Sequence, residues 1–288
     1  MILDCHAHFD PQLLDVPTAL RKMDEVGVAR VALIPPLNGP IPDTPKHLLA
    51  VMRHLMNGRG RPLAERIHRH AMVDGGFKLG KLAFPIFPLP DNEPVAEVLR
   101  AHPTRFLGWV FLNPAVDPTP LDTLERYRTV PGMVGVKLHP HWHDYRTEVL
   151  GPVLARCQEL GLPVLIHLGF GERGDFRAIC RDYPRLNVIS AHAGFPFYKD
   201  LWRFRDECPN LHVDLSSPYI DERLARATVA AMGAERCLYG TDAPYGFHAE
   251  DSSYDYGEIL GWVARMPLSE VERDAVLMQN AARLLRLE

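Results

Sequence analysis

The sequence predicts an α/β protein whose eight parallel strands close into a (β/α)₈ barrel, the TIM barrel. Eight short apolar runs recur along the chain, each bounded by glycine, proline or polar residues. Stretches with helical periodicity lie between several of these runs. Successive runs are also spaced almost evenly, as repeated strand-helix units require.

The eight runs are predicted strands, and they cover residues 2–9, 28–35, 106–112, 134–139, 163–168, 187–193, 211–216 and 237–241. Several are almost continuously hydrophobic, as in Val164-Leu165-Ile166. Such runs are typical of strands buried on both faces of a parallel sheet. Helices are predicted over 94–102, 148–160 and 221–232, the last with Asp221 as its N-cap.

The spacing is measured from one marker residue per run, and the markers are His6, Leu33, Val110, Lys137, His167, His192, Asp214 and Asp242. The gaps are 27, 77, 27, 30, 25, 22 and 28 residues, whereas a strand-helix unit takes about 30 residues. The long gap indicates an insertion after the second strand, approximately residues 37–90. Within it we predict helices over 45–57 and 63–72 and a proline-rich return over 84–90.

A loop that follows a strand lies on the catalytic face of such a barrel. Long insertions in compact domains usually serve function. The insertion is therefore expected to be a lid, a substrate wall or a dimer contact. We expect residues 1–288 to form a single domain around it.

A doubly wound open sheet is the alternative architecture, because it also alternates strands and helices. Such a sheet normally carries a glycine-rich phosphate loop after its first strand. Here the first run ends in His6-Ala7-His8-Phe9, and the sequence has neither a G-x-G-x-x-G nor a Walker motif.

Composition limits the function classes. The hydrophobic share of 47% and the net charge of −4 fit a soluble protein, with no indication of a nucleic-acid or membrane partner. Five cysteines without a C-x-x-C pair favour free thiols in a reducing cytoplasm. The first residues do not resemble a signal peptide, and no apolar run approaches the ~20 residues that span a bilayer. We expect a cytoplasmic protein that acts on a small molecule, with homodimer formation left open.

The H-x-H spacing occurs at His6/His8 and at His68/His70, and twice within residues 139–143. His6 and His8 lie on the first predicted strand, where a period of two residues points both rings to one side. Two imidazoles placed in this way can hold one ion. His68 and His70 lie on a polar predicted helix, where rings two residues apart diverge, and we predict solvated surface for them.

Three further polar residues stand at the ends of other strands: His167, His192 and Asp242. Each follows an apolar run and precedes a loop with glycine or proline. In a parallel barrel such positions meet at one mouth. Imidazoles with a carboxylate suit Zn²⁺ and similar divalent ions.

Six segments carry a family resemblance: residues 1–11 with the H-x-H, Gly135-Val136-Lys137-Leu138-His139-Pro140, Leu165-Ile166-His167-Leu168-Gly169, Ser190-Ala191-His192-Ala193-Gly194, Tyr239-Gly240-Thr241-Asp242-Ala243-Pro244 and Asn280-Ala281-Ala282-Arg283-Leu284. Together they resemble the amidohydrolase superfamily, and most closely its amidohydrolase-2 branch. The resemblance covers nearly the whole chain apart from the insertion.

The resemblance implies roles for these residues. His6, His8 and His167 match metal ligands. Asp242 matches a carboxylate that touches the ion and carries a proton. His192 matches either a ligand of a second ion or a residue that polarises the substrate.

Lys137 has three interpretations. In some members of the superfamily a carboxylated lysine on the fourth strand bridges two ions, with His167 and His192 then on the second ion. A free ammonium beside a cation is the second interpretation, and an anchor for a substrate carboxylate is the third. A single ion is favoured, with Zn²⁺ expected and Mn²⁺ as the alternative.

Two further residues are candidates near this site. His139 shares a strand face with Lys137 and is a candidate substrate contact. Asp214 shares a face with His212 and Ser216, where it either supports a ligand or bonds within the barrel.

The resemblance implies hydrolysis of an amide, lactone or other ester by metal-activated water. Non-oxidative decarboxylation of an unsaturated or aromatic carboxylic acid is the alternative. Phosphoester cleavage and a catalytically silent barrel are further alternatives. Release of CO₂ separates the first two, and absence of metal binding would favour the last.

Overall fold

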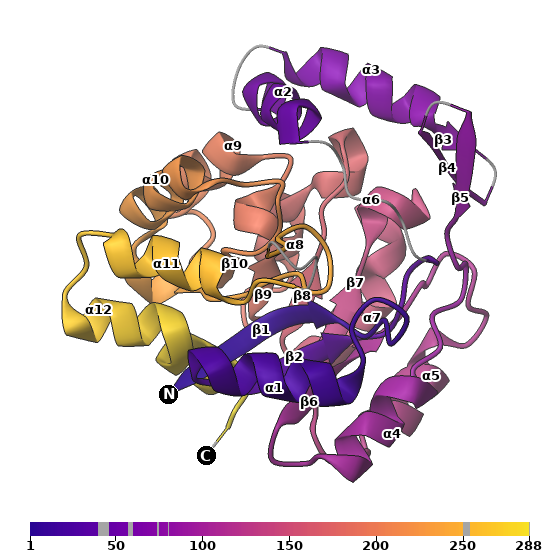
Figure 1. Ribbon diagram of the computed structural model, residues 1–288. Helices are drawn as coiled ribbons and strands as arrows, with labels where there is room; N and C mark the ends of the chain where they lie inside the picture. Colours follow the sequence, from indigo (N-terminus) through magenta and orange to yellow (C-terminus); the bar gives the residue numbers. More distant parts are fainter. Residues whose placement is uncertain (40–45, 57–59, 74, 80, 250–253, 288) are drawn as a thin grey trace.

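The computed structural model describes residues 1–287 except 40–45, 57–59, 74, 80 and 250–253. Within these residues eight parallel strands form one sheet in the order β1-β2-β6-β7-β8-β9-β10-β11 (Figure 1). The strands are β1 (Ile2–His8), β2 (Val28–Ile34), β6 (Phe106–Phe111), β7 (Met133–Leu138), β8 (Val164–Ile166), β9 (Val188–Ser190), β10 (Leu211–Asp214) and β11 (Cys237–Leu238). All eight predicted strands are confirmed, several of them shortened at their ends.

The sheet closes because β1 also pairs with the residues that follow β11. The amide of Cys5 donates to the carbonyl of Tyr239 (3.0 Å), and the amide of Asp242 donates to the carbonyl of His6 (2.7 Å). Ala7 and Ala243 form a parallel bridge beyond these bonds. The fold is therefore a TIM barrel, and the doubly wound alternative is wrong.

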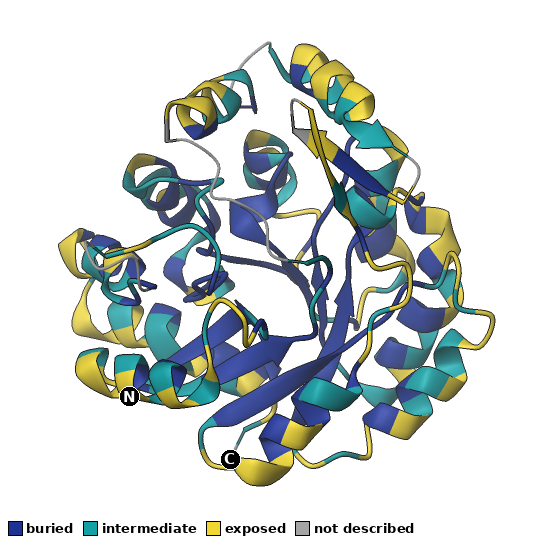
Figure 2. Cartoon of the chain, turned by 45° about the vertical axis from the view of Figure 1, so that its right-hand side comes forward, coloured by how far each residue is buried: buried dark blue, intermediate teal, exposed yellow. Residues whose placement is uncertain are grey.

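The strands are buried on both faces, which explains their continuous hydrophobic runs. All six residues of β6 are buried. Leu107, Trp109 and Phe111 belong to one apolar cluster, whereas Phe106 and Val110 belong to another. In Figure 2 the strands are almost entirely buried, and exposed residues concentrate on the outer faces of the surrounding helices.

Helices surround the sheet, and side-chain N-caps begin some of them. They are α1 (Val16–Val26), α4 (Glu93–Ala101), α5 (Pro120–Tyr127), α6 (Pro140–His143), α7 (Gly151–Leu160), α8 (Phe176–Asp182), α9 (Tyr198–Phe204), α10 (Glu222–Met232), α11 (Gly257–Arg265), α12 (Glu270–Asp274) and α13 (Asn280–Leu284). Short 3₁₀ turns cover Thr147–Leu150, Gly171–Gly174, His192–Gly194 and Ala234–Arg236, and a π turn covers Ala275–Gln279. The predicted N-cap is confirmed, because the Asp221 carboxylate accepts from the amide of Leu224 (2.9 Å).

The insertion contains α2 (Lys46–Met56) and α3 (Arg61–Ala71), which confirms both predicted helices. Residues 45 and 57, at the ends of the first prediction, lie outside the described residues. A small antiparallel sheet of β3 (Met72–Val73), β4 (Gly76–Leu79) and β5 (Leu82–Pro85) was not predicted, although β5 overlaps the start of the proline-rich return.

The insertion lies above the barrel in Figure 1 and is held to the loops that follow the strands. The guanidinium of Arg53 donates to the carbonyl of Pro218 (2.8 Å) and pairs with Asp221 (3.2 Å). Arg61 forms an ion pair with Asp200. These contacts place the insertion over the catalytic face.

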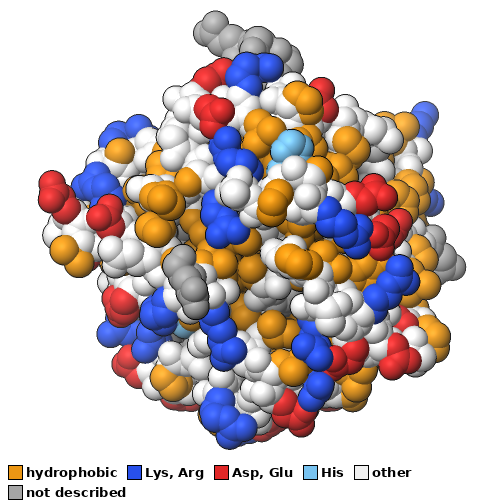
Figure 3. Space-filling view, turned by 90° about the horizontal axis from the view of Figure 1, so that it is seen from below, with side chains coloured by type: hydrophobic (Ala, Val, Ile, Leu, Met, Phe, Trp, Pro, Cys, Tyr) orange, Lys and Arg blue, Asp and Glu red, His pale blue; other side chains and the backbone are white. Residues whose placement is uncertain are grey.

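The face shown in Figure 3 carries both charged and apolar side chains. On this face acidic and basic side chains are interspersed around the edge, with apolar side chains between them (Figure 3). All five cysteines are buried free thiols, as predicted. Among the described helices, none combines the length and the apolar character needed to cross a bilayer.

Candidate metal centre

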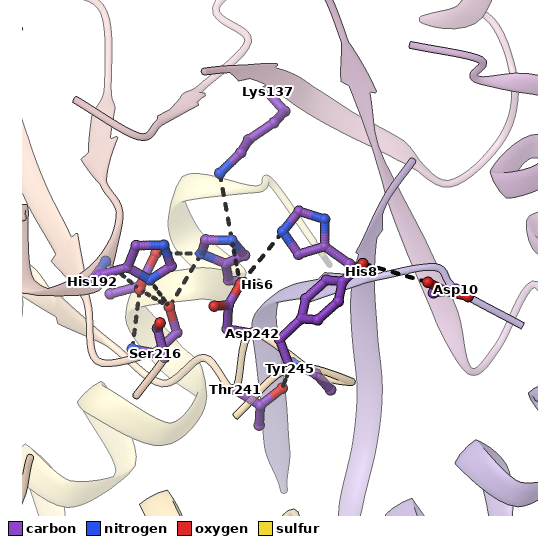
Figure 4. A network of polar contacts seen from close by, with 12 residues as sticks. His6, His8, Asp10, Lys137, His192, Ser216, Thr241, Asp242 and Tyr245 are labelled. Atoms are coloured by element: carbon purple, nitrogen blue, oxygen red, sulfur yellow. Dashed lines mark hydrogen bonds and ion pairs between the residues drawn. The ribbon is translucent and has the colours of Figure 1, made fainter. Parts of the chain in front are cut away.

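Three predicted ligands meet at the seam where the barrel closes. The Nε2 atoms of His6 and His8 lie 3.5 and 3.4 Å from the same oxygen of Asp242 (Figure 4). One ligand atom from each of the three residues falls within 4.8 Å of the others. The side chains are 0%, 8% and 9% exposed, so the group is nearly shielded from bulk water.

The backbone around Asp242 is shaped to bring this carboxylate to the histidines. Asp242 has φ 63° and His192 has φ 55°, both in the left-handed region. Asp and His adopt this region more readily than most other residues, and functional sites often contain such conformations. Gly240 permits a close approach of the chain, because a Cβ there would lie 3.1 Å from Cβ of His6.

Asp214 fixes the ring of His6 from behind. Its Oδ2 lies 2.8 Å from Nδ1 of His6. This bond assigns the ring proton to Nδ1 and leaves a lone pair on Nε2, as a metal ligand needs. His6, His192 and Asp214 form a second compact group of candidate ligands. Since Asp214 already holds Nδ1 of His6, we interpret that group as a hydrogen-bonded support.

His192 is oriented through Ser216. The Ser216 hydroxyl donates to Asp214 Oδ1 (2.5 Å), so it accepts from Nδ1 of His192 (2.8 Å). Burial lowers the pKa of His192 well below its usual value, which keeps the ring neutral. Its Nε2 is therefore a lone-pair atom, suited to accept a proton or to bind an ion.

His167 lies beside the compact group but is not a member of it. Its Nδ1 faces the carbonyl of Leu168 (3.2 Å), and its buried Nε2 has no hydrogen-bond partner among the described residues. The ring packs against His192 at 4.7 Å between centroids and stacks on His139 at 4.4 Å. His139 accepts at Nδ1 from the amide of Trp142 (3.2 Å), which leaves Nε2–H to donate.

Lys137 reaches the centre from β7, with its Nζ 3.4 Å from Nε2 of His6 (Figure 4). It is fully buried. Burial lowers its pKa to about 8, although the nearby Asp214 and Asp242 oppose this effect. An amine with this pKa exchanges protons near neutral pH and can react as a nucleophile when neutral.

Asp4, which sequence reasoning missed, supports the site from below. Its carboxylate accepts from the Thr241 hydroxyl (2.5 Å) and from the amides of His6 (3.0 Å) and Thr241 (3.1 Å). Burial raises its pKa to about 7. Asp4 thereby ties the first strand to the residue before Asp242. The same period of two that places His6 and His8 on one face also includes Asp4, which was the available signal.

The prediction for His68 was wrong, whereas His70 is exposed as predicted. Both ring nitrogens of His68 are buried, and the ring lies 4.2 Å from that of His141. The helical period correctly separates the two rings. The position of α3 above the barrel, which the sequence does not give, turns His68 inward.

The fold and these residues define a TIM barrel with a candidate metal centre at its catalytic mouth. Comparison with known families then identifies the chain. The family model described as amidohydrolase matches residues 3–287, and the chain therefore belongs to the amidohydrolase-2 family of enzymes. A comparison with curated proteins finds no match.

Solved structures resemble the chain over nearly its full length. A 2,6-dihydroxybenzoate decarboxylase from Rhizobium is 18% identical, with a TM-score of 0.64 and coverage of 99% of this chain and 98% of that one. A dihydroxybenzoic acid decarboxylase from Polaromonas, with bound manganese and 2-nitroresorcinol, is 17% identical (TM-score 0.62; coverage 99% and 97%). A proposed 2-pyrone-4,6-dicarboxylic acid hydrolase from Pseudomonas putida is 20% identical (TM-score 0.64; coverage 100% and 98%). At these identities the likeness shows the fold alone.

Proposed function

We propose that this enzyme is a hydrolase that cleaves an amide, lactone or other ester bond with water activated by a divalent ion. One observation carries the proposal. A single oxygen of Asp242 faces Nε2 of both His6 and His8 in a nearly buried position. Two imidazoles and one carboxylate in this arrangement match the ligand preference of Zn²⁺.

His6, His8 and Asp242 would hold the ion, with His167 as the fourth ligand. The tautomers support this set, since Nδ1 of His6 and of His167 each faces an acceptor and leaves Nε2 to bind. Zn²⁺ is the expected ion and Mn²⁺ the alternative. When bound, a divalent ion lowers the pKa of a water toward ~7 and polarises a substrate carbonyl.

The protein's own groups then move the proton. Asp242 accepts the proton of the attacking water and returns it to the leaving group. Its left-handed backbone directs the carboxylate toward the two histidines. His192, held by Ser216, presents a neutral Nε2 and can share the proton transfer.

The chemical state of Lys137 determines whether the site can hold one ion or two. A free amine 3.4 Å from Nε2 of His6 competes with an ion for that atom, so we propose that Lys137 either turns toward the substrate or is carboxylated. Carboxylation would recruit His167 and His192 to a second ion. We favour one ion. Intact-protein mass spectrometry under CO₂, with metal analysis, should show no carboxylation and one ion per chain.

The proposed function is tested by metal removal and replacement. The purified protein is treated with a chelator, tested on a panel of amides, lactones and esters, and then supplied with Zn²⁺ or Mn²⁺. We expect activity to disappear with the metal and to return with it. Full activity in the metal-free protein would contradict the proposal.

Decarboxylation of an aromatic or unsaturated acid is the second candidate, because aromatic rings line the approach to His167. Phe195 packs 5.6 Å from His167 and stacks on Tyr219 at 4.8 Å. Two of the similar structures are decarboxylases of dihydroxybenzoic acids. A panel of aryl carboxylates monitored for CO₂ release, in parallel with the ester and amide panel, distinguishes the two reactions.

A further inference from the structure

His68 extends from the insertion into the loops above the barrel. Its ring lies 4.2 Å from His141, 5.3 Å from Phe170 and 6.0 Å from Trp142. His141 and Trp142 belong to α6, which follows β7, and Phe170 follows β8. The insertion therefore contributes a side chain to the catalytic face itself.

The two ring nitrogens of His68 make no hydrogen bond to any residue that the structure describes. Both nitrogens are also buried. A buried donor without a partner destabilises the folded state. Leucine would fill similar space without that cost. Packing alone gives no reason for a histidine here.

A series of ring contacts joins His68 to the candidate metal centre. His141 stacks on His167 at 4.8 Å, His167 packs on His192 at 4.7 Å, and His192 stacks on His6 at 4.9 Å. Nδ1 of His141 and Nε2 of His167 are also buried and unpaired among the described residues. Unsatisfied nitrogens thus recur between His68 and the centre.

A cleft lies next to His68, lined by its chain neighbour Arg69 and by Trp142, which its ring contacts. This cleft separates the insertion from α6, and Arg69, Trp142, His143 and Arg173 contribute to its lining. His68 contacts Trp142 directly, so it stands between the cleft and the imidazoles that lead to the centre. A substrate entering through the cleft would meet His68 before it reached Asp242.

The side chains around His68 determine the charge of its ring and the kind of group that the ring can bind. Burial and the nearby charge of Arg173 lower the pKa of His68 to about 4, so the ring is neutral and can both donate and accept. Burial likewise lowers the pKa of His141, with Arg173 as a lesser cause. Arg173 is ion-paired with Asp144, so it adds little net charge, and the neutral imidazoles can hydrogen-bond an oxygen group.

We propose that His68 is a substrate-binding residue, which hydrogen-bonds a hydroxyl, carbonyl or carboxylate oxygen at the end of the substrate remote from the reacting group. The inference rests on the proposed function in one respect: the reacting group must lie at His6, His8 and Asp242. The substrate is then an elongated molecule with oxygen groups at both ends. Apolar rings, including those of Phe170 and Phe195, flank its middle.

The test compares three variants: His68→Leu, His68→Gln and His70→Leu. His70 is the matched control, because it shares the helix and the H-x-H motif but is exposed and bonds only the carbonyl of Arg66 (2.7 Å). Binding of benzoate, 4-hydroxybenzoate and terephthalate to the Zn²⁺-loaded proteins is measured by calorimetry. Thermal unfolding of each protein is recorded without any probe.

Wild type should bind the two probes with a distal oxygen more tightly than benzoate. His68→Leu should lose about tenfold in affinity for those two and leave benzoate unchanged. His68→Gln should keep part of the preference, and His70→Leu should behave as wild type. The Tm of His68→Leu should rise by about 2 °C, since an unpaired buried group is removed.

Equal affinities of wild type and His68→Leu for all three probes would overturn the inference. If wild type binds none of the three probes, the inference is overturned as well. If the activity of the wild type does not depend on metal, the proposed function is wrong, but the comparison of probe affinities between the variants still holds.

Discussion

Two copies of the H-x-H motif, one on β1 and one on α3, have different roles. On β1 the strand period points His6 and His8 to one side, where both face Asp242. On α3 the helical period sends His70 to the surface and His68 into the loops above the barrel. The spacing is the same, but the secondary structure decides how many rings reach the site.

The two copies also differ in what fixes them. Nδ1 of His6 is held by Asp214, and the strand is held by the barrel seam. His68 has neither kind of partner among the described residues, and only ring packing positions it. These differences agree with our proposals that the strand motif binds an ion and that His68 of the helix motif binds substrate.

The largest effect is expected for Asp242, whose carboxylate faces both histidines of the strand motif. Asp242→Asn keeps the shape but removes the proton acceptor, so kcat should fall by about 10²- to 10⁴-fold. Activity and metal content are measured together, with Asp182→Asn on the exposed surface as the control. If Asp242→Asn kept wild-type activity, Asp242 would not carry the proton.

Asp214→Asn tests what orients His6. The asparagine amide would place a donor at Nδ1 and favour the ring proton on Nε2, which removes the lone pair needed for an ion. We expect metal affinity to fall by about 10- to 100-fold. Competition with a coloured chelator measures this affinity, and Asp206→Asn on the surface is the control. Unchanged metal affinity would show that Asp214 does not contribute to metal binding.

Gly240→Ala tests how closely β11 and its following residues must approach β1. The added methyl would lie 3.1 Å from Cβ of His6 and 3.2 Å from Cβ of Ser216. We expect the free energy of unfolding to fall by about 1–3 kcal/mol. Gly39→Ala is the matched control, since a Cβ there meets nothing within 4 Å. Equal urea midpoints for the two variants would count against a tight seam.

The smallest expected effect is a pH dependence that separates His68 from His70. Because the folded pKa of His68 is lowered to about 4 from 6.5, the unfolded chain takes up the proton first as pH falls. The free energy of unfolding of the wild type therefore falls as the pH drops from about 6.5 toward 4. His68→Leu should become more stable than wild type by about 1 to 2 kcal/mol over this range. Urea unfolding at several pH values, with His70→Leu as the control, measures the difference.

The barrel was predictable because its strands repeat a simple pattern. Val164-Leu165-Ile166 and similar runs mark strands buried on both faces, and their even spacing identifies the helices between them. Candidate ligands at strand ends could be located for the same reason, since parallel strands deliver their ends to one mouth. The residues that orient the candidate ligands were harder to predict. Ser216 and Thr241 act through contacts between residues far apart in the sequence.

The insertion was predictable only in part. Its two helices have clear periodicity, but β4 has no continuous apolar run and β5 ends within the proline-rich return. The inward ring of His68 depends on where α3 is anchored, through ion pairs such as Arg61 with Asp200. Such contacts join residues more than a hundred positions apart, and local patterns carry no information about them.

The seam between the first and last strands has a consequence for how the protein is made. His6 and His8 emerge from the ribosome early, but the carboxylate they face belongs to Asp242, which follows more than two hundred residues later. The proposed ligand set would thus be complete only after Asp242 has been synthesised and the ring of strands has closed. An ion bound there would favour the closed ring over the open one by mass action. Metal supply would then govern the yield of mature enzyme as well as its turnover.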